Sequence, residues 1–233
     1  MHTFLDSKSM AKALRSALAE RRIDITHSDS LELVARQFGF DNWNILAARI
    51  EQASVLDGAL PAGWKAHHHA PYPLHSIGRD PDDQSAVKIV SIASADVVGS
   101  NHATLMQSIA ADDYRGHALR FSAELKGEDL DQGTIWMRID PRGGGSAIRF
   151  DNMLARGSDG ALSGTVGWTE RSIVLDVPVE AASIHFGPML KGVGRLWARN
   201  LRLDTVPAET ATTDTRRLPR RPTNLDFGSG APA

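Results

Sequence analysis

At 233 residues, the chain is long enough for one large domain or two smaller ones, each with an adequate hydrophobic core. A hydrophobic content of 42% and a net charge of −2 indicate a soluble globular protein and argue against a globally basic nucleic-acid binder. Cysteine is absent, which excludes disulfides and thiolate chemistry. Because neither a secretory pattern nor an apolar run of about 20 residues is present, we expect a cytoplasmic protein with no membrane association.

Residues 1–56 predict a three-helix domain. Met10, Leu14, Ala17 and Leu18 form one apolar stripe along the first helix. Thr26 or Ser28 can begin the second helix, Gly39 can end it in a left-handed conformation, and Asp41 can cap the third. The expected core residues of this domain are Leu31, Val34, Phe38, Phe40 and Ile45.

The spacing of Leu31, Ala35, Gly39 and Ile45 matches a helix-turn-helix. The charge does not favour DNA, because residues 1–56 contain seven Lys or Arg and seven Asp or Glu, whereas DNA affinity comes mainly from phosphate neutralisation. We therefore predict that the start of the third helix contacts a protein partner, with DNA binding as a disfavoured alternative. The residues assigned to that surface are Asp41, Asn42, Trp43 and Asn44.

Residues 60–206 predict an antiparallel β-sandwich or jelly roll, since short alternating segments replace the helical period. The chain as a whole is therefore expected to be an α+β multidomain protein. Glycine-rich turns are expected at Gly127, at 141–145, at 157–160 and at 192–194. The predicted strands are Val87–Ala93, Thr104–Ile109, His117–Leu125, Thr134–Ile139, Ala147–Phe150, Ser172–Val177, Ala182–Phe186 and Arg195–Leu203.

Residues 207–233 are polar and rich in Arg, Thr and Pro, which predicts a flexible tail. Its last residues, LDFGSGAPA, echo LDGALPAG at 56–63. This similarity suggests that the tail adds to a sheet edge as a strand, while a coincidental match of two Gly- and Pro-rich strings is the alternative.

A candidate ligand site lies in the β-rich part. Trp136 and Arg138 share one face of their predicted strand, opposite Ile135, Met137 and Ile139, and Asp140 follows. A tryptophan beside an arginine and an acid can hold a sugar ring and its hydroxyls. The alternative is that Trp136 packs in the core and Arg138 pairs with an acid. Asp151 and Asn152 either join this site or order a turn through side-chain to backbone hydrogen bonds.

We expect no metal, cofactor or catalytic residue. His67, His68, His69 and His75 form a cluster that suggests zinc, but their spacing predicts a solvated loop. The acids Asp80, Asp82 and Asp83 could bind a hard cation such as calcium, and a polar turn is the preferred interpretation.

Two resemblances add to these patterns. The strings LELVA at 31–35 and GFDNW at 39–43 resemble a small helical domain of bacterial proteins labelled glyoxalase-related, a label that does not imply glyoxalase chemistry in the helices. Residues 60–206, with PAGW at 61–64, WMR at 136–138 and FDNM at 150–153, resemble a galactose-binding-like sandwich attached to bacterial transcription regulators, including some of AraC type. That resemblance implies a two-sheet sandwich with loop-borne binding sites.

Together these features predict a non-enzymatic binding or adaptor protein. The helical domain is expected to dock on a protein partner, and the sandwich to hold a small molecule, such as a carbohydrate, or a second protein. The first alternative is a ligand-sensing transcription regulator that binds DNA through its helices. A weaker alternative is a metal enzyme of glyoxalase type.

Overall fold

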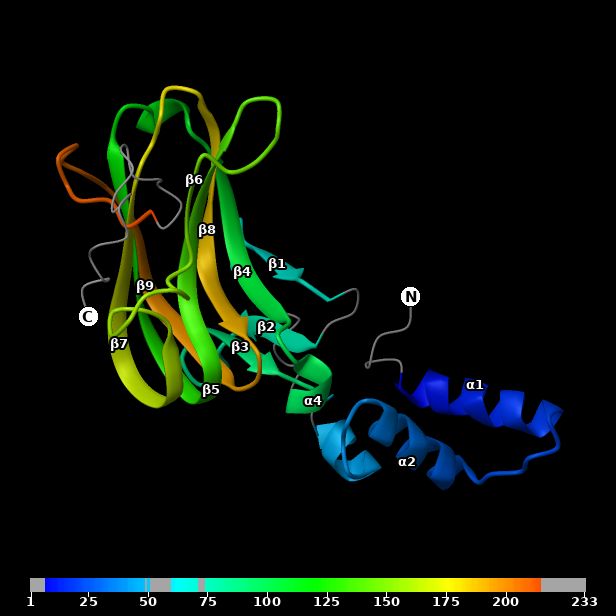
Figure 1. Cartoon of the computed structure of the whole chain (residues 1–233). Helices are drawn as coiled ribbons and strands as arrows, with labels where there is room; N and C mark the ends of the chain where they lie inside the picture. Colours follow the sequence, from blue (N-terminus) through cyan, green and yellow to red (C-terminus); the bar gives the residue numbers. More distant parts are fainter. Residues whose placement is uncertain (1–6, 49, 51–59, 71–73, 215–233) are drawn as a thin grey trace, which may run out of the picture.

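The computed structural model describes residues 7–48, 50, 60–70 and 74–214. A helical domain precedes a larger β-sandwich, and the short helix α4 (Ala95–Val98) lies between them (Figure 1). The helical domain contains α1 (Ser7–Glu20), α2 (His27–Gln37) and a third helical segment at residues 43–48. None of the described helices is long and apolar enough to cross a membrane.

The start of α2 follows from a local sequence signal. Thr26 is its N-cap: the Thr26 hydroxyl accepts a hydrogen bond from the Asp29 amide at 3.0 Å, and the Asp29 carboxylate accepts one from the Thr26 amide at 3.2 Å. This capping box satisfies two amides that the helix leaves unpaired. The Thr26 hydroxyl also donates to the Asp29 carboxylate at 2.7 Å, and this bond, followed by the one from the Thr26 amide, lowers the pKa of Asp29. Gly39 follows the helix with φ of 77°, as predicted.

The predicted helix-turn-helix frame is correct at Ala35 and wrong at Ile45. Ala35 is fully buried, whereas Ile45 is 41% exposed and its neighbour Leu46 is fully buried instead. The third helix is capped by Asn42, whose side-chain oxygen accepts from the Ile45 amide at 3.0 Å, and not by Asp41. Because the helix starts one residue later than expected, the residue that faces the core moves by one position.

Between residues 60 and 206, the described part of the chain forms nine strands and two short helices, α4 among them. Its strands pair only with antiparallel neighbours. Its elements are β1 (Lys65–His68), β2 (His75–Arg79), β3 (Val87–Ser91), α4, β4 (His102–Ala110), the 3-10 helix η2 (Asp112–Tyr114), β5 (Ala118–Pro141), β6 (Arg149–Asp151), β7 (Leu162–Asp176), β8 (Ala181–Lys191) and β9 (Arg195–Val206).

The long strand β5 belongs to both layers of the sandwich. Its first half pairs with β9 up to residue 128 and with β7 up to residue 133, and β9 continues the layer through β3 to β2. Its second half, from residue 132, pairs with β6 and β8, and β8 continues through β4 to β1. We call the layer β1-β4-β8-β5-β6 the first layer and the layer β2-β3-β9-β5-β7 the second layer.

The expectation of a turn at Gly127 is wrong, because β5 continues through this position. The strand instead shifts its register against β7 between Leu125 and Gly133. A Cβ atom at Gly127 would lie 2.2 Å from the Leu130 side chain, and one at Gly133 would lie 2.8 Å from it. These glycines let Leu130 fold inward where the strand passes from one layer to the other.

The main core fills the space between the layers. Phe121 of the second layer and Phe186 of the first have ring centroids 5.0 Å apart, and Trp64 meets Phe186 edge-on at 5.9 Å. The alternation predicted for the two halves of β5 is confirmed, with the inward residues buried and the outward ones on the two outer faces. The inward residues are Leu119, Phe121, Ala123, Leu125, Ile135, Met137 and Ile139.

The helical domain packs against the sandwich beside α4. Phe38 and Ile50 contact Ile92, and a Cβ atom at Gly39 would lie 2.1 Å from the Ser94 hydroxyl oxygen. Gly39 therefore serves both the left-handed turn and the close approach of the two domains.

The first residues of the predicted tail contact the edge strand β7. The Thr213 amide donates to the Val174 carbonyl at 2.8 Å, and the Thr213 hydroxyl oxygen accepts from the Val174 amide at 3.0 Å. The segment LDFGSGAPA at 225–233 lies outside the described residues, as does LDGA at 56–59, so its predicted pairing with a sheet edge stays a prediction.

Candidate ligand-binding site

A cavity of about 590 Å³ lies on the outer face of the first layer. Alternate residues of β4, β5 and β8 point into it, because the opposite residues of the same strands point into the core. The loop after β6 completes the wall. The lining residues are His67, His102, Thr104, Met106, Ser108, Trp136, Arg138, Phe150, Asn152, Leu154, His185, Met189 and Lys191.

Trp136 forms part of the cavity floor. Its indole Nε1 donates to the Thr104 hydroxyl oxygen at 2.7 Å, and the Thr104 hydroxyl lies 2.7 Å from the Pro188 carbonyl oxygen, to which it donates. Only 8% of Trp136 is exposed, so the ring offers an edge or part of a face rather than an open stacking surface. The two hydrogen bonds fix the ring, and Met106 and Met189 line the cavity with it.

One end of the cavity holds a network of polar side chains. Arg138 pairs with Asp140 at 2.8 Å, and His185 Nε2 lies 3.3 Å from the same carboxylate. His185 Nδ1 lies 2.7 Å from the Ser108 hydroxyl. Burial, followed by the positive charge of Arg138, lowers the pKa of His185, while Asp140 acts in the opposite direction. We call Ser108, Arg138, Asp140 and His185 the polar end.

The network at the polar end is not complete. Arg138 Nε and Asp140 Oδ1 are shielded from solvent and have no hydrogen-bond partner among the described residues. Buried polar atoms are normally paired, because leaving one unpaired costs about 1–3 kcal/mol. The polar end therefore retains a donor and an acceptor that the protein itself does not use.

The opposite end of the cavity carries His67, His102 and Lys191, which we call the basic end. His102 is the direct partner of Lys191 across β4 and β8, and His67 is the partner of Thr104 across β1 and β4. Paired residues lie on the same face of a sheet, so the three side chains share the outer face. Burial, followed by His69, His67 and Lys191, lowers the pKa of His102.

The structure brings together three of the five predicted ligand residues in the cavity wall, namely Trp136, Arg138 and Asn152. Asp140 lies beside them through its ion pair with Arg138. Both alternatives raised for this strand also hold in part, because Trp136 is buried and Arg138 is paired. Whether these residues bind a ligand stays a prediction.

Asp151 is fully buried and does not line the cavity. Its carboxylate pairs with Arg156 and accepts from the Met153 amide at 2.8 Å. Met153 has φ of 60°, a left-handed conformation that a non-glycine residue adopts only with support. Asp151 thus holds the turn that carries Asn152 into the cavity wall, which agrees with the turn-ordering interpretation.

The remaining lining residues were not predicted. His102, Thr104, Met106 and Ser108 alternate along one strand, and His185, Met189 and Lys191 share a face of another. This alternation was a usable signal in the sequence. The sequence could not show that β4 pairs with β8, or that β8 pairs with the second half of β5.

The predicted histidine loop is wrong, since His67 and His68 belong to β1 and His75 to β2. His69 stacks on His102 with ring centroids 4.8 Å apart, and buried His75 contacts the Gly192 carbonyl through Nε2 at 2.8 Å. Among the residues that the structure describes, no three His, Asp or Glu side chains converge as a metal site requires.

The acidic string around Asp80 makes internal contacts. Asp80 accepts from the indole Nε1 of Trp197 at 2.8 Å, and Asp83 accepts from the Ser85 hydroxyl at 2.5 Å. The Asp82 amide lies 3.3 Å from Asp80. These bonds form a polar turn, the preferred interpretation of this string.

The outer face of the second layer carries aromatic and cationic side chains. Lys88 and Lys126 flank Trp197, each with Nζ 4.6 Å from the ring centroid. Arg199 lies 4.0 Å above Trp168 and donates from Nε to Glu124 at 2.7 Å. Protein groups already cover these rings, so we call this surface the covered face.

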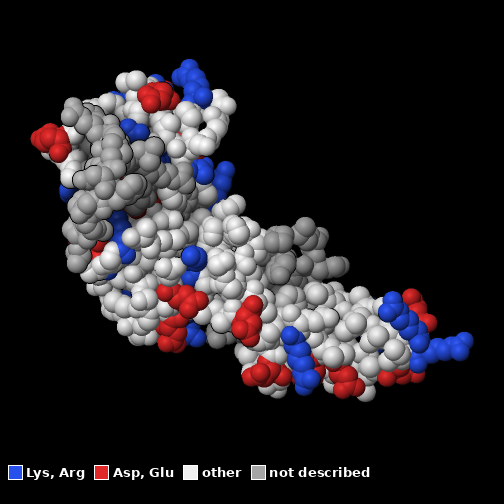
Figure 2. Space-filling view, in the orientation of Figure 1, with Lys and Arg blue, Asp and Glu red and all other residues white. Residues whose placement is uncertain are grey.

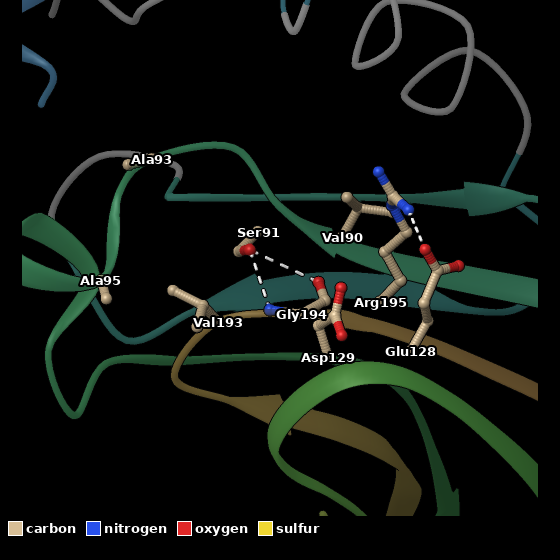
Figure 3. Close-up of a pocket in the computed structure, with 9 residues that line it drawn as sticks. All are labelled: Val90, Ser91, Ala93, Ala95, Glu128, Asp129, Val193, Gly194 and Arg195. Atoms are coloured by element: carbon tan, nitrogen blue, oxygen red, sulfur yellow. Dashed lines mark hydrogen bonds and ion pairs between the residues drawn. The ribbon is translucent and has the colours of Figure 1, made fainter. Parts of the chain in front are cut away.

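A second, smaller cavity of about 260 Å³ lies near α4 (Figure 3). The Gly194 amide donates to the Ser91 hydroxyl at 2.9 Å, and Arg195 pairs with Glu128 at its rim. These two contacts occupy polar groups of Ser91, Gly194, Arg195 and Glu128. Few polar groups of this cavity are therefore available to a ligand.

The residues assigned to a partner surface lie at the start of the third helix. Trp43 is half-buried against the helical core, in contrast to its predicted exposure, and its amide donates to Glu32 at 3.1 Å. Asn42 is used as a cap, whereas Asp41 and Asn44 are exposed. Figure 2 shows Lys and Arg interspersed with Asp and Glu along the visible face of this domain. The partner assignment stays a prediction.

Residues 1–67 match the family described as "Glyoxalase superfamily protein", which confirms the resemblance of the helical domain. Over 129 residues the chain is 35% identical to the "Uncharacterized HTH-type transcriptional regulator YbfP" of Bacillus subtilis (strain 168). That match covers 54% of this chain and 42% of the relative, so the chain spans less than half the length of this curated protein.

Two solved structures show a looser likeness. One is the structure of TmCBM61 in complex with β-1,4-galactotriose, with a TM-score of 0.40, 13% identity, and coverage of 64% of this chain and 92% of that chain. The other is the CBM22-1 xylan-binding domain of Xyn10C from Paenibacillus barcinonensis, with a TM-score of 0.40, 12% identity, and coverage of 65% and 91%. Both TM-scores are below 0.5.

Proposed function

We propose that this protein is a ligand-sensing regulatory protein whose sandwich holds a small polyhydroxylated molecule in the cavity of the first layer. The observation that carries the proposal is the composition of the cavity wall, where polar side chains of Ser108, Asn152 and His185 stand beside an apolar wall. A ligand with neighbouring hydroxyl groups both donates and accepts, so it suits these polar side chains.

The size and lining of the cavity support the same class of ligand. Pockets of roughly 300–1,000 Å³ accommodate small molecules, and such pockets combine an apolar wall with a few polar groups that fix orientation. Here Trp136, Phe150 and Met189 supply the apolar wall. The similarity to a named regulator favours a regulatory role over the adaptor role expected from the sequence.

Calorimetric titration of the full chain with neutral mono- and disaccharides tests the proposal. We expect at least one saccharide to bind, and Arg138→Met to weaken it by about tenfold or more, since charge-assisted hydrogen bonds contribute about 1.5–3 kcal/mol. Arg199→Met is the matched control, because Arg199 lies on the covered face. Absence of binding by every saccharide, or an equal loss in both variants, would contradict the proposal.

DNA binding by the helical domain is a second candidate, which the name of the regulator relative favours. The turn at Gly39 suits a helix-turn-helix, whereas the exposed Ile45 and the mixed charges do not. A gel-shift series at two salt concentrations with random duplex DNA tests this candidate. A complex that weakens at high salt supports DNA binding, and no complex at either concentration leaves docking on a protein as the proposed role of this domain.

A further inference from the structure

The charge of the cavity lining is strongly one-sided. Among the described residues that line it, none is Asp or Glu, whereas five can carry a positive charge: His67, His102, Arg138, His185 and Lys191. Asp140 stands next to the wall and pairs with Arg138 and His185, so it compensates the polar end only.

The basic end has no such compensation in its wall. The partners of Lys191 across the sheet are His102 on β4 and Gln132 on β5, neither of which is an acid. The carboxylate of Asp131 accepts from the Val193 amide at 2.9 Å and lies against Gly192, in the turn between β8 and β9. Asp131 does not line the cavity.

The groups around His102 make the basic end favourable for an anion. His69 stacks on the His102 ring, and His67 and Lys191 face it from β1 and β8. His75 also interacts electrostatically with it. Each of these groups is neutral or positive, so protonation of His102 is opposed in the free protein. A negative charge placed among them reverses that effect.

We infer that the ligand carries an anionic group, bound at the basic end between Lys191, His102 and His67. The hydroxylated remainder then extends over Trp136 to the polar end. This inference rests on the proposed function and adds the charge of the ligand to it. Sugar acids and sugar phosphates share the required chemistry.

Three forms of one sugar distinguish the possibilities: D-galactose, D-galacturonate and D-galactose 6-phosphate, with the corresponding glucose series measured in parallel. We expect an anionic form to bind the full chain about tenfold more tightly than its neutral counterpart. Preference for the uronate or for the phosphate identifies which anion fits. Equal or tighter binding of the neutral sugar would overturn the inference and leave the proposed function standing. Binding by no member of either series counts against both.

Two variants locate the anion. Lys191→Gln should weaken binding of the anionic form about tenfold more than binding of the neutral sugar, and so remove the preference for the anion. Lys12→Gln, an equal change of charge at an exposed position of α1, should preserve the preference. If both variants reduce the preference equally, the effect comes from overall charge and the assignment to the basic end is wrong.

The pH dependence gives a second readout. A bound anion raises the pKa of His102, so binding takes up a proton and the affinity increases as the pH falls from 8 to 5.5. For each unit by which the anion raises the pKa of His102, the affinity at pH 5.5 exceeds the affinity at pH 8 by a factor of at most about ten. The carboxylate remains ionised throughout, because its own pKa is about 4. His102→Gln should flatten this dependence, and an unchanged profile in that variant would contradict the assignment.

Discussion

On the first layer of the sandwich, Trp136 and Arg138 border an open cavity, whereas on the second layer Trp168 and Arg199 are stacked on each other. Both outer faces combine tryptophan, arginine and an acid, which lie on the single strand β5 in the first layer and on the strands β7, β9 and β5 in the second. On the covered face, Lys88 and Lys126 occupy the two sides of Trp197 and Asp80 accepts from its indole nitrogen. The two faces thus contain the same residue types. On the covered face the cations lie over the tryptophan rings, whereas on the first layer Trp136 and Arg138 border a cavity.

The largest effect that separates the two faces is expected from Trp197→Ala. Trp197 is 7% exposed, and its removal deletes a large packed ring and leaves Asp80 without its indole donor. The free energy of unfolding should fall by about 3–5 kcal/mol, measured by chemical denaturation. Saccharide affinity of the folded fraction should be unchanged. A loss of binding at unchanged stability would show that the covered face is the ligand site.

The next effect concerns His75, which is buried behind the basic end. Burial lowers the pKa of His75 from its ordinary value of 6.5 to about 4. The unfolded chain therefore binds a proton between pH 6.5 and 4 that the folded chain does not, so stability falls as the pH falls through this window. The loss attributable to this group amounts to about 3 kcal/mol.

Denaturation curves at pH 7 and pH 4 test this prediction in the wild type and in His75→Gln. The variant should be less stable at pH 7, because glutamine fits the site poorly, yet it should lose less stability on acidification. Parallel losses in the two proteins would show that other groups carry the acid sensitivity.

A smaller effect compares the two arginines directly. Arg199→Met removes a cation–π contact and should lower the free energy of unfolding by about 1–2 kcal/mol. Arg138→Met removes a half-exposed ion pair and should change it by less than about 1 kcal/mol. Thermal unfolding of the two variants side by side measures the difference. If Arg138→Met proved more destabilising than Arg199→Met, the proposed difference between the cavity face and the covered face would be wrong.

The sequence predicted the faces of strands better than their neighbours. Alternation along residues 117–125 and 134–139 correctly placed Phe121 and Ile135 on the inward side of the strand and Trp136 on the opposite side, where it is nevertheless buried. It could not show that Gly127 lies inside a strand, because the sequence alone does not distinguish a glycine required by a close contact from a glycine required by a turn. The start of the third helix was ambiguous for a similar reason, because either Asp41 or Asn42 can cap a helix. Asn42 is the cap in the structure, and the one-residue difference places Ile45 outside the core.

The candidate site was predictable only in the part that one strand carries. Trp136, Arg138 and Asp140 follow one another on β5, so their proximity is local. His185 and Ser108 come from β8 and β4, and their approach depends on strand pairings between residues 77 positions apart. Such pairings are set by the packing of the whole sandwich, and no local spacing encodes them.

The contact between Thr213 and Val174 has a consequence for association between molecules. Strand β7 pairs with β5 on one side, and no other strand among the described residues pairs with its opposite side. Thr213 occupies both backbone groups of Val174 with its amide and its hydroxyl, and so interrupts the row of groups that a strand of another molecule needs for pairing. A chain shortened before residue 207 would lose this contact, and we expect its sandwiches to associate through their β7 edges.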